Sequence, residues 1–267
     1  MSLDKVTILD FKRKKDDGEK ITMLTAYDCP MAGIVDSAGI DAVLVGDSVG
    51  MVVLGYDSTV SVTMDEMIHH CKAVRRGVKR AFLIGDMPFM SYQASDEDAV
   101  RNAGRFVQEA GCEAVKIEGG RETCSRIKAM VDVGIPVLGH IGLTPQSINK
   151  IGRYKVQGKD PDAAKTIAED AVLLEKAGCF AIILECVPSD LAGKITAKLR
   201  VPTIGIGAGQ LCDGQVLVTY DMIGYYDKFT PKFVKRYADI NKTIREAVST
   251  FKKETEEGSF PDEEHSF

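Results

Sequence analysis

The sequence lacks the features that tie a protein to a membrane or to nucleic acid. No apolar run approaches the roughly 18 to 20 residues that a membrane span requires, and no signal peptide opens the chain. The formal net charge is −5 and the isoelectric point is about 5.5, so positive charge is not in excess. We therefore expect a cytoplasmic protein whose partners are small molecules, with neither nucleic acid nor a membrane among them.

Paired cysteines are also missing. The seven cysteines make an odd number and include no C-x-x-C pair, the spacing typical of zinc sites and redox motifs. Several lie in apolar runs, such as Cys112 and Cys179, where cysteine behaves as a small hydrophobic residue. We expect reduced, structural thiols rather than disulfides or a zinc site.

The composition that remains is that of an ordinary globular protein. Of the 267 residues, 45% are hydrophobic and 27% are charged, which provides enough apolar material for a full core. This length suits two average domains or one α/β barrel. No linker divides the chain, so we expect one domain over residues 1–252, with an N-terminal helix at about 4–15, and an acidic, mobile tail over residues 253–267.

One short pattern occurs three times, at residues 37–47, 109–118 and 176–185. Each copy has a helix that ends in Ala-Gly, then an apolar strand, then an acid seven or eight residues after the glycine. Glycine suits the end of a helix because it adopts the left-handed conformation without steric cost. The repeated unit is therefore a helix, a tight turn, a strand and an acid.

Further segments extend this alternation. Apolar strands are predicted at residues 21–28, 80–88, 136–143, 202–209 and 216–224, and helices from Thr63, from about Ser95, and over 121–133, 161–177, 189–198 and 231–252. Continuously apolar strands separated by helices indicate a parallel sheet that is covered on both faces. The eight strands favour an α/β fold of the (βα)8 barrel type, although the last two are joined by too few residues for a helix. A doubly wound open sheet is the alternative.

Polar residues gather at the predicted carboxyl ends of the strands, where the active site of a barrel lies. They are Asp28, Asp47, Ser48, Asp86, Lys116, Glu118, His140 and Glu185, and the strand starts carry no such set. Alternate side chains of a strand face the same way, so Lys116 and Glu118 share one face. A lone acid here is often only a helix cap, and a lone histidine is often structural. Acids at the same end of at least four strands nevertheless indicate a common site.

Clustered carboxylates repel one another unless a cation or a proton lies between them. A hard cation with oxygen ligands fits this requirement, so we predict Mg²⁺ bound by Asp47, Asp86 and Glu118. Lys116 is then available for an anionic group of a substrate, and Glu185 for proton abstraction. The glycine-rich residues 205–209 lack the G-x-G-x-x-G spacing of a dinucleotide site, and we interpret them as a loop at the mouth of the seventh strand.

Longer motifs resemble one enzyme family. Between about residues 5 and 240, the segments TAYDCPMAGIVDSAGIDAVLVGDSVGM, TMDEMIHHCKAVRRG, GDMPFMSY, AVKIEGG, GHIGLTPQSINKIGRYKVQGK, LECVP and VPTIGIGAGQLCDGQVLV are similar to the ketopantoate hydroxymethyltransferase family. The resemblance implies a TIM barrel of the phosphoenolpyruvate/pyruvate type. It implies transfer of a hydroxymethyl group from 5,10-methylenetetrahydrofolate to 3-methyl-2-oxobutanoate, giving 2-dehydropantoate in the first step of pantothenate biosynthesis. It also implies a homodecamer, a pentamer of dimers.

The same resemblance assigns roles to individual residues. The magnesium ligands that it implies are Asp47, Asp86 and Glu118. The residues that it places against the keto acid are Asp47, Ser48, Asp86 and Lys116, and Glu185 becomes the proton acceptor. His140 matches an active-site histidine of the family, and we expect it to contact the substrate.

Two alternative functions stay open at this stage. One is a folate-independent, Mg²⁺-dependent 2-oxo acid lyase or aldolase on the same barrel, and the other is a non-catalytic barrel that binds a metabolite. A folate-dependence assay separates the first, and turnover with Mg²⁺ separates the second. The segment 144–159 has Gly152 and Gly158 as hinges and is predicted to be a lid or a wall of the folate site, or else a packed surface or inter-subunit loop.

Overall fold

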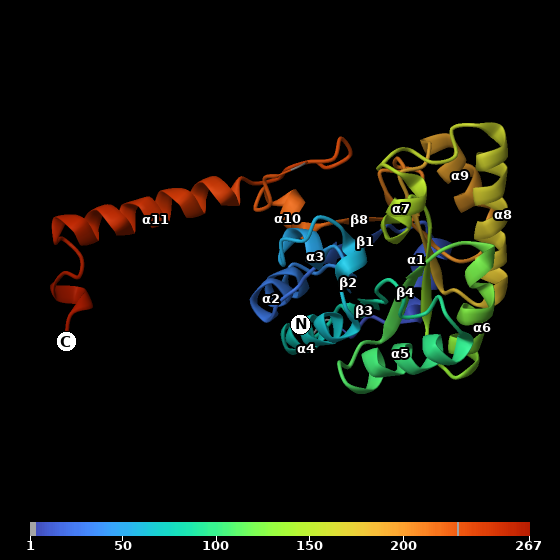
Figure 1. Ribbon diagram of the computed structural model, residues 1–267, viewed down its shortest axis with the longest axis horizontal. Coiled ribbons are helices and arrows are strands. Elements are labelled where there is room, and N and C mark those ends of the chain that lie inside the picture. The colour runs from blue at the N-terminus through green and yellow to red at the C-terminus, as the bar shows by residue number, and fades with distance from the viewer. Residues whose placement is uncertain (1–3, 229) are drawn as a thin grey trace. The chain divides into compact units, whose positions relative to one another are not determined.

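Eight parallel strands close into a barrel in the computed structural model, which describes residues 4–228 and 230–267 (Figure 1). The strands pair in chain order, and β1 pairs with β8 to complete the circle. They are β1 (Ile21–Thr25), β2 (Ala42–Val45), β3 (Phe82–Asp86), β4 (Ala114–Glu118), β5 (Val137–Gly142), β6 (Ala181–Glu185), β7 (Thr203–Ile206) and β8 (Gly214–Leu217). The predicted barrel is confirmed, and the open sheet is wrong.

Helices connect the strands in the alternation that the sequence predicts. They are α1 (Ile8–Asp17), α2 (Cys29–Ser37), α3 (Val49–Val52), α4 (Met64–Gly77), α5 (Asp96–Gln108), α6 (Cys124–Asp132), α7 (Ile148–Ile151), α8 (Pro161–Ala177) and α9 (Ser189–Lys198), with short 3-10 turns η1 (Thr59–Ser61), η2 (Arg121–Thr123) and η3 (Pro145–Ser147). The glycines of the threefold pattern, Gly39, Gly111 and Gly178, have positive φ angles, as expected for the turn that follows a helix.

Several predicted ends are wrong. The N-terminal helix, expected at about 4–15, is α1 (Ile8–Asp17), and the strands expected at 21–28, 80–88 and 202–209 are shorter. Two further errors have a clear structural reason. Residues 216–224 are predicted as one strand, but β8 ends at Leu217 and residues 219–222 are helical. Leu217 pairs with Leu24, and β1 ends one residue later, so no strand is available to pair with a longer β8. The final helix is α11 (Ile240–Glu257) rather than 231–252, because Asp239 caps it by accepting a hydrogen bond from the Lys242 N–H.

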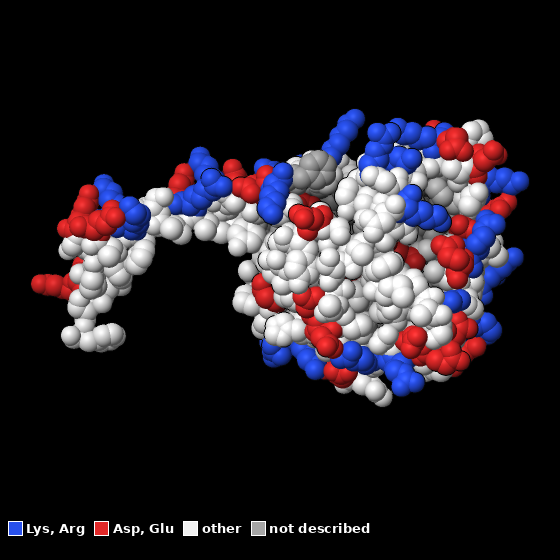
Figure 2. Space-filling view, in the orientation of Figure 1, with Lys and Arg blue, Asp and Glu red and all other residues white. Residues whose placement is uncertain are grey.

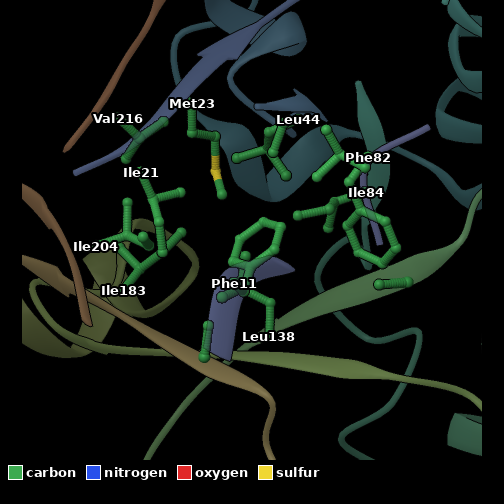
Figure 3. Packing of buried hydrophobic residues seen from close by; sticks show 14 residues of the cluster. Phe11, Ile21, Met23, Leu44, Phe82, Ile84, Leu138, Ile183, Ile204 and Val216 are labelled. Carbon is green, nitrogen blue, oxygen red and sulfur yellow. The ribbon is translucent and has the colours of Figure 1, made fainter. Parts of the chain in front are cut away.

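The apolar core fills the barrel and is closed at the strand starts by α1. Phe11 of α1 is 1% exposed and lies among inward-facing side chains of the strands (Figure 3). Its ring makes edge-to-face contacts with Phe82 and Phe180, at centroid distances of 5.6 and 5.3 Å. Burying such a ring contributes about 1.5 to 3 kcal/mol to the stability of the fold. Through Phe11, α1 closes the apolar interior at this end of the barrel.

Charged residues at the strand starts form a second feature of this end. Three acids stand one residue before β2, β4 and β8 and accept backbone N–H groups: Asp41 from Thr22 (2.8 Å), Glu113 from Leu83 (2.9 Å) and Asp213 from Thr203 (2.8 Å). Each acid also pairs with a lysine of the N-terminal segment: Lys14 with Asp41 (2.7 Å), Lys5 with Glu113 (2.6 Å) and Lys15 with Asp213 (2.7 Å). The expectation that strand starts carry no such set is therefore wrong.

The chain divides into two compact units, Met1–Val218 and Thr219–Phe267. The second unit contains α10 (Thr219–Met222), α11 and η4 (Glu263–His265), and its longest helix continues past the expected boundary at residue 252. A single domain over 1–252 followed by a mobile tail stays a prediction. No helix within residues 4–228 and 230–267 is long and apolar enough to cross a membrane. On the face shown in Figure 2, Lys and Arg side chains lie among Asp and Glu, without a field of one sign.

Candidate active site at the carboxyl ends of the strands

The barrel brings most of the predicted site residues together at the carboxyl ends of adjacent strands. In the sheet register, Asp86 of β3 pairs with Lys116 of β4, and Glu118 pairs with His140 of β5. Asp47 follows β2, and its backbone N–H donates to Asp86 Oδ2 at 3.0 Å. These five residues are all at most 5% exposed. Each lies on the inward face of its strand or just beyond it, so the site forms where the apolar interior ends.

Lys116 is the cation at the centre of this group. Its Nζ lies 2.5 Å from Asp86 Oδ2 and 3.8 Å from Glu118 Oε1. Burial opposes the charged form of Lys116, but the carboxylates of Asp86, Glu118 and Asp47 together outweigh burial and raise its pKa. The ammonium group therefore stays charged, and it has further N–H donors for a ligand beyond the one given to Asp86.

The three predicted metal ligands differ in how readily they ionise. Burial raises the pKa of Asp47 well above its usual range, and the neighbouring carboxylates of Asp86 and Glu118 raise it further. Burial also raises the pKa of Asp86, although the charge of Lys116 opposes that rise. For Glu118, burial is outweighed by the nearby His140 and Lys116, so the pKa of this carboxyl is lowered. Repulsion between buried carboxylates is therefore a property of the site itself.

His140 lies between two carboxylates. Its Nδ1 is 3.4 Å from Glu118 Oε1, and its Nε2 is 3.1 Å from Glu185 Oε2. Burial favours the neutral ring, but Glu118 and Glu185 outweigh it and raise the pKa of His140 to about 9. Neither nitrogen has the alignment of a hydrogen bond with a described residue, so the attraction is ionic. With His140 protonated, four acids (Asp47, Asp86, Glu118 and Glu185) share two cations, Lys116 and His140.

Two further predicted residues have local partners. Ser48 precedes α3, and its Oγ lies 2.8 Å from the hydroxyl of Tyr27, next to Asp47. Asp28 is the N-cap of α2 and accepts a hydrogen bond from the Met31 N–H at 2.8 Å. The structure thus contains the helix cap that a lone acid such as Asp28 often provides.

Sequence comparison supplies the family. The chain matches the family model of ketopantoate hydroxymethyltransferase over residues 5–263. It is 59% identical to 3-methyl-2-oxobutanoate hydroxymethyltransferase of Syntrophomonas wolfei over 98% of this chain and 95% of that protein. It is 58% identical to the enzyme of the same name from Syntrophus aciditrophicus, over 98% of this chain and 97% of that protein.

The chain belongs to the ketopantoate hydroxymethyltransferase family. It is an enzyme, a transferase of pantothenate biosynthesis, and the non-catalytic barrel is excluded. Solved structures agree on the fold. Phosphonopyruvate hydrolase, solved as a complex with oxalate and Mg²⁺, has a TM-score of 0.63 and 12% identity over 97% of this chain and 93% of that chain. A 2,3-dimethylmalate lyase of the PEP mutase/isocitrate lyase superfamily has a TM-score of 0.61 and 14% identity over 97% of this chain and 91% of that chain.

Two polar residues of the site were missed by the sequence analysis. Gln146 is 4% exposed and contacts Asp47 and Glu118, and Tyr92 is 1% exposed and contacts Glu118 and Gln146. Both lie in segments that carry the resemblance to the hydroxymethyltransferase family. Their position in these segments was the one signal in the sequence that could have indicated them. Their contacts, however, depend on the path of the loops after β3 and β5, which the sequence pattern does not give.

The donor set suits the divalent cation that the family resemblance implies. Asp86 Oδ1 and Glu118 Oε1 are buried without a hydrogen-bond partner among the described residues. Buried carboxylate oxygens of this kind are the ligands that Mg²⁺ prefers, and a cation relieves the repulsion between them. As the side chains stand in residues 4–228 and 230–267, no three His, Cys, Asp or Glu residues are arranged around one metal position. These residues therefore suit Mg²⁺ by the type and charge of their ligand atoms, and not by an arrangement already formed around one metal position.

The segment 144–159 lies beside this site and is held at both ends. At its start, Gln146 contacts the carboxylates, and near its end the Gln157 N–H donates to the Cys186 carbonyl at 2.8 Å. Tyr154 lies between these two residues in the chain and is 46% exposed, and its pKa is raised by burial and then by the charges of Asp47 and Glu185. A role of this segment as a lid or as a wall of the folate site stays a prediction.

Proposed function

We propose that the buried charged group at the carboxyl ends of β2 to β6 catalyses hydroxymethyl transfer from 5,10-methylenetetrahydrofolate to 3-methyl-2-oxobutanoate, forming 2-dehydropantoate. The name shared by relatives at 58 and 59% identity supports this keto acid. The observation that carries the proposal is a site of four acids and two cations at the end of a barrel where substrates bind. Two of its buried carboxylate oxygens have no hydrogen-bond partner among residues 4–228 and 230–267.

We propose Asp47, Asp86 and Glu118 as the residues that hold Mg²⁺. When bound, the cation supplies positive charge beside the oxygens of the keto acid, where negative charge develops during reaction. Support comes from the excess of buried carboxylates over cations. Asp86 Oδ1 and Glu118 Oε1 also lack a hydrogen-bond partner in the part of the chain that the structure describes. A protein of the same fold, phosphonopyruvate hydrolase, has been solved with Mg²⁺.

The remaining residues have roles that follow from their charge and position. Lys116 offers N–H donors to the carboxylate of the keto acid, and Ser48 offers its hydroxyl from the adjoining turn. Glu185 removes the proton from C3 of the keto acid, and the resulting enolate forms a bond to the methylene carbon that the folate supplies. Both carbon–nitrogen bonds of that methylene group break, water supplies the hydroxyl oxygen of the product, and tetrahydrofolate leaves with its two nitrogens protonated. The Glu185 side chain is 16% exposed and therefore reachable from the mouth, while His140 beside it keeps its carboxylate oriented. His140 also stands close enough to the mouth to contact the substrate.

The decisive experiment measures formation of 2-dehydropantoate by purified protein from both substrates. With Mg²⁺ we expect product, and after removal of metal with a chelator we expect none until Mg²⁺ is restored. A reaction without the folate serves as the control for a lyase or aldolase. Consumption of the keto acid that does not need the folate, or the absence of product at saturating Mg²⁺, would contradict the proposal.

We also propose that the enzyme acts in the cytoplasm and assembles as a homodecamer, a pentamer of dimers. The support is the family resemblance together with exposed apolar side chains such as Ile34 (63% exposed) and Val133 (59% exposed), which an assembly could cover. Light scattering coupled to size exclusion measures the mass directly. A monomeric mass at micromolar concentration would contradict the assembly.

A further inference from the structure

Gln146 links two of the proposed metal ligands to each other. Its Nε2 donates to Asp47 Oδ2 at 2.9 Å and to the Met87 carbonyl at 2.9 Å. Its backbone N–H donates to Glu118 Oε2 at 3.0 Å. One residue thus holds an oxygen of each of two proposed metal ligands, which come from different strands and lie 71 positions apart in the chain. The other oxygen of Glu118, Oε1, has ionic contacts with His140 and Lys116 but no hydrogen-bond partner among the described residues.

The hydrogen bonds define one orientation for the Gln146 amide. Its Oε1 accepts from the Tyr92 hydroxyl at 2.9 Å and from Gln93 Nε2 at 3.2 Å, so donors face the oxygen and acceptors face the nitrogen. A rotated amide would place its oxygen against the Asp47 carboxylate and the Met87 carbonyl, which are both acceptors. The side chain is therefore locked in the orientation that donates to Asp47.

Tyr92 closes the network from the other side. Its hydroxyl accepts the backbone N–H of Glu118 at 3.0 Å, in addition to its contact with Gln146. The strand end that carries Glu118 is thus tied through Tyr92 to the residue that holds the Glu118 carboxylate. Hydrogen bonds are stronger in a buried, low-dielectric setting than in water, so this network restrains the relative position of the groups that it connects.

We propose that Gln146 is a positioning residue, anchored by Tyr92, that holds Asp47 and Glu118 in the arrangement needed for a divalent cation and so sets the affinity of the site for it. This inference rests on the proposed metal site. Groups that orient metal ligands typically change metal affinity by about 10- to 100-fold when they are removed. Gln146 does not itself touch the reacting atoms, and the effect of its loss therefore falls on metal binding.

The test is a titration of the metal-free full-length protein with Mn²⁺, in which electron paramagnetic resonance reports the free ion. Mn²⁺ prefers the same oxygen ligands as Mg²⁺. The variant Gln146→Met keeps the length of the side chain and the backbone N–H to Glu118 but removes the amide. We expect it to bind Mn²⁺ about 10- to 100-fold more weakly than the wild type. The variant Tyr92→Phe removes one hydroxyl, and we expect a smaller loss in the same direction.

Gln215→Met is the matched control. Gln215 is an exposed glutamine of β8 that donates to the Gly209 carbonyl at 2.9 Å, and we expect this variant to bind Mn²⁺ as the wild type does. If Gln146→Met and Tyr92→Phe bind as tightly as the wild type, the inference is overturned and the proposed function stands. If the wild type does not bind Mn²⁺, the proposed metal site fails first. If circular dichroism shows that Gln146→Met is unfolded, Tyr92→Phe alone decides the question.

A second measurement separates positioning from catalysis. Exchange of the C3 hydrogen of the keto acid in D₂O, without folate, is followed by proton NMR at increasing Mg²⁺. For Gln146→Met we expect slow exchange at low Mg²⁺ and recovery toward the wild-type rate at saturating Mg²⁺. Exchange that stays at least tenfold slower at saturation would overturn the positioning role, because the defect would then lie in the chemical step.

Discussion

The two ends of the barrel both carry buried acids, but they differ in how far the carboxylate oxygens of those acids are hydrogen-bonded. At the strand starts, Asp41, Glu113 and Asp213 each have a lysine and a backbone N–H as partners. At the strand ends, Asp86 and Glu118 each keep a buried oxygen without a hydrogen-bond partner in the described part of the chain. An unpartnered buried acceptor costs about 1 to 3 kcal/mol. The first end is therefore arranged for stability, and the second retains binding capacity at the expense of stability.

Among variants that compare the two ends, Glu185→Gln should have the largest effect on the reaction. The amide keeps the shape of the side chain but cannot accept the C3 proton, so we expect hydrogen exchange at C3 to fall about 10²- to 10⁴-fold. Binding of the keto acid should persist. Proton NMR in D₂O measures the exchange, and calorimetric titration measures the binding. Glu113→Gln, at the opposite end, is the control and should exchange at the wild-type rate. Exchange that survives in Glu185→Gln would remove this residue from the role of base.

Asp41→Ala tests the other end. Asp41 is 4% exposed, so its removal leaves Lys14 and the Thr22 N–H without their buried acceptor. We expect the free energy of unfolding to fall by about 3 to 5 kcal/mol, as is typical when one partner of a buried pair is lost. Turnover by the folded protein should be unchanged. Urea denaturation gives the stability, and the product assay gives the turnover.

The corresponding variant at the strand ends is Asp86→Asn. It removes a proposed metal ligand, so we expect loss of Mg²⁺-dependent turnover. The amide oxygen can still accept a hydrogen bond from Lys116, and the lost charge is one that the buried acids Glu118 and Asp47 repel, so we expect a smaller loss of stability than in Asp41→Ala. Equal destabilisation by Asp41→Ala and Asp86→Asn would mean that the two ends do not differ in the way described.

The stability of the metal-free protein should depend on pH through His140. Its pKa is about 9 in the folded protein, against an ordinary value of 6.5. Because the folded pKa is raised, protonated His140 adds stability that is fully present below about pH 6.5 and is lost as the pH rises through 9. The shift corresponds to roughly 3 kcal/mol at most. Urea denaturation at pH 6 and pH 10 measures it, and His140→Gln should show a smaller difference between these two conditions. An identical pH dependence in both proteins would count against the ionic contacts with Glu118 and Glu185.

The sequence predicted many of the site residues at the carboxyl ends of the strands, because the alternation of side chains along a strand can be read from a few neighbouring residues. The alternation along β4 puts Lys116 and Glu118 on one face, and the barrel then brings Asp86 and His140 beside them. Gln146 could not be predicted in this way. Its contacts depend on how the chain after β5 folds back over β2 and β4, which no local pattern describes.

Two errors of the sequence analysis also come from contacts between distant parts of the chain. The apolar residues after Leu217 suit a strand, but the length of β8 is limited by the end of β1, its partner far along the chain. Asp41, Glu113 and Asp213 stand just outside their strands, and their role depends on lysines that are distant in sequence. Periodicity predicts which way a side chain points but not which residue meets it.

The smallest expected effect comes from an exposed ion pair on helix α6. Lys128 and Asp132 are one helical turn apart on α6, with a nitrogen–oxygen distance of 2.9 Å, close to the 2.7 Å between Lys14 and Asp41. Their side chains are 69% and 57% exposed, whereas those of Lys14 and Asp41 are 19% and 5% exposed. Water and salt screen the exposed pair, so we expect Lys128→Ala to change the free energy of unfolding by less than about 0.5 kcal/mol. Urea denaturation of this variant beside Asp41→Ala measures how far burial, rather than distance, sets the energy of a pair. A loss of several kcal/mol in Lys128→Ala would show that the stability of the strand starts cannot be attributed to their burial.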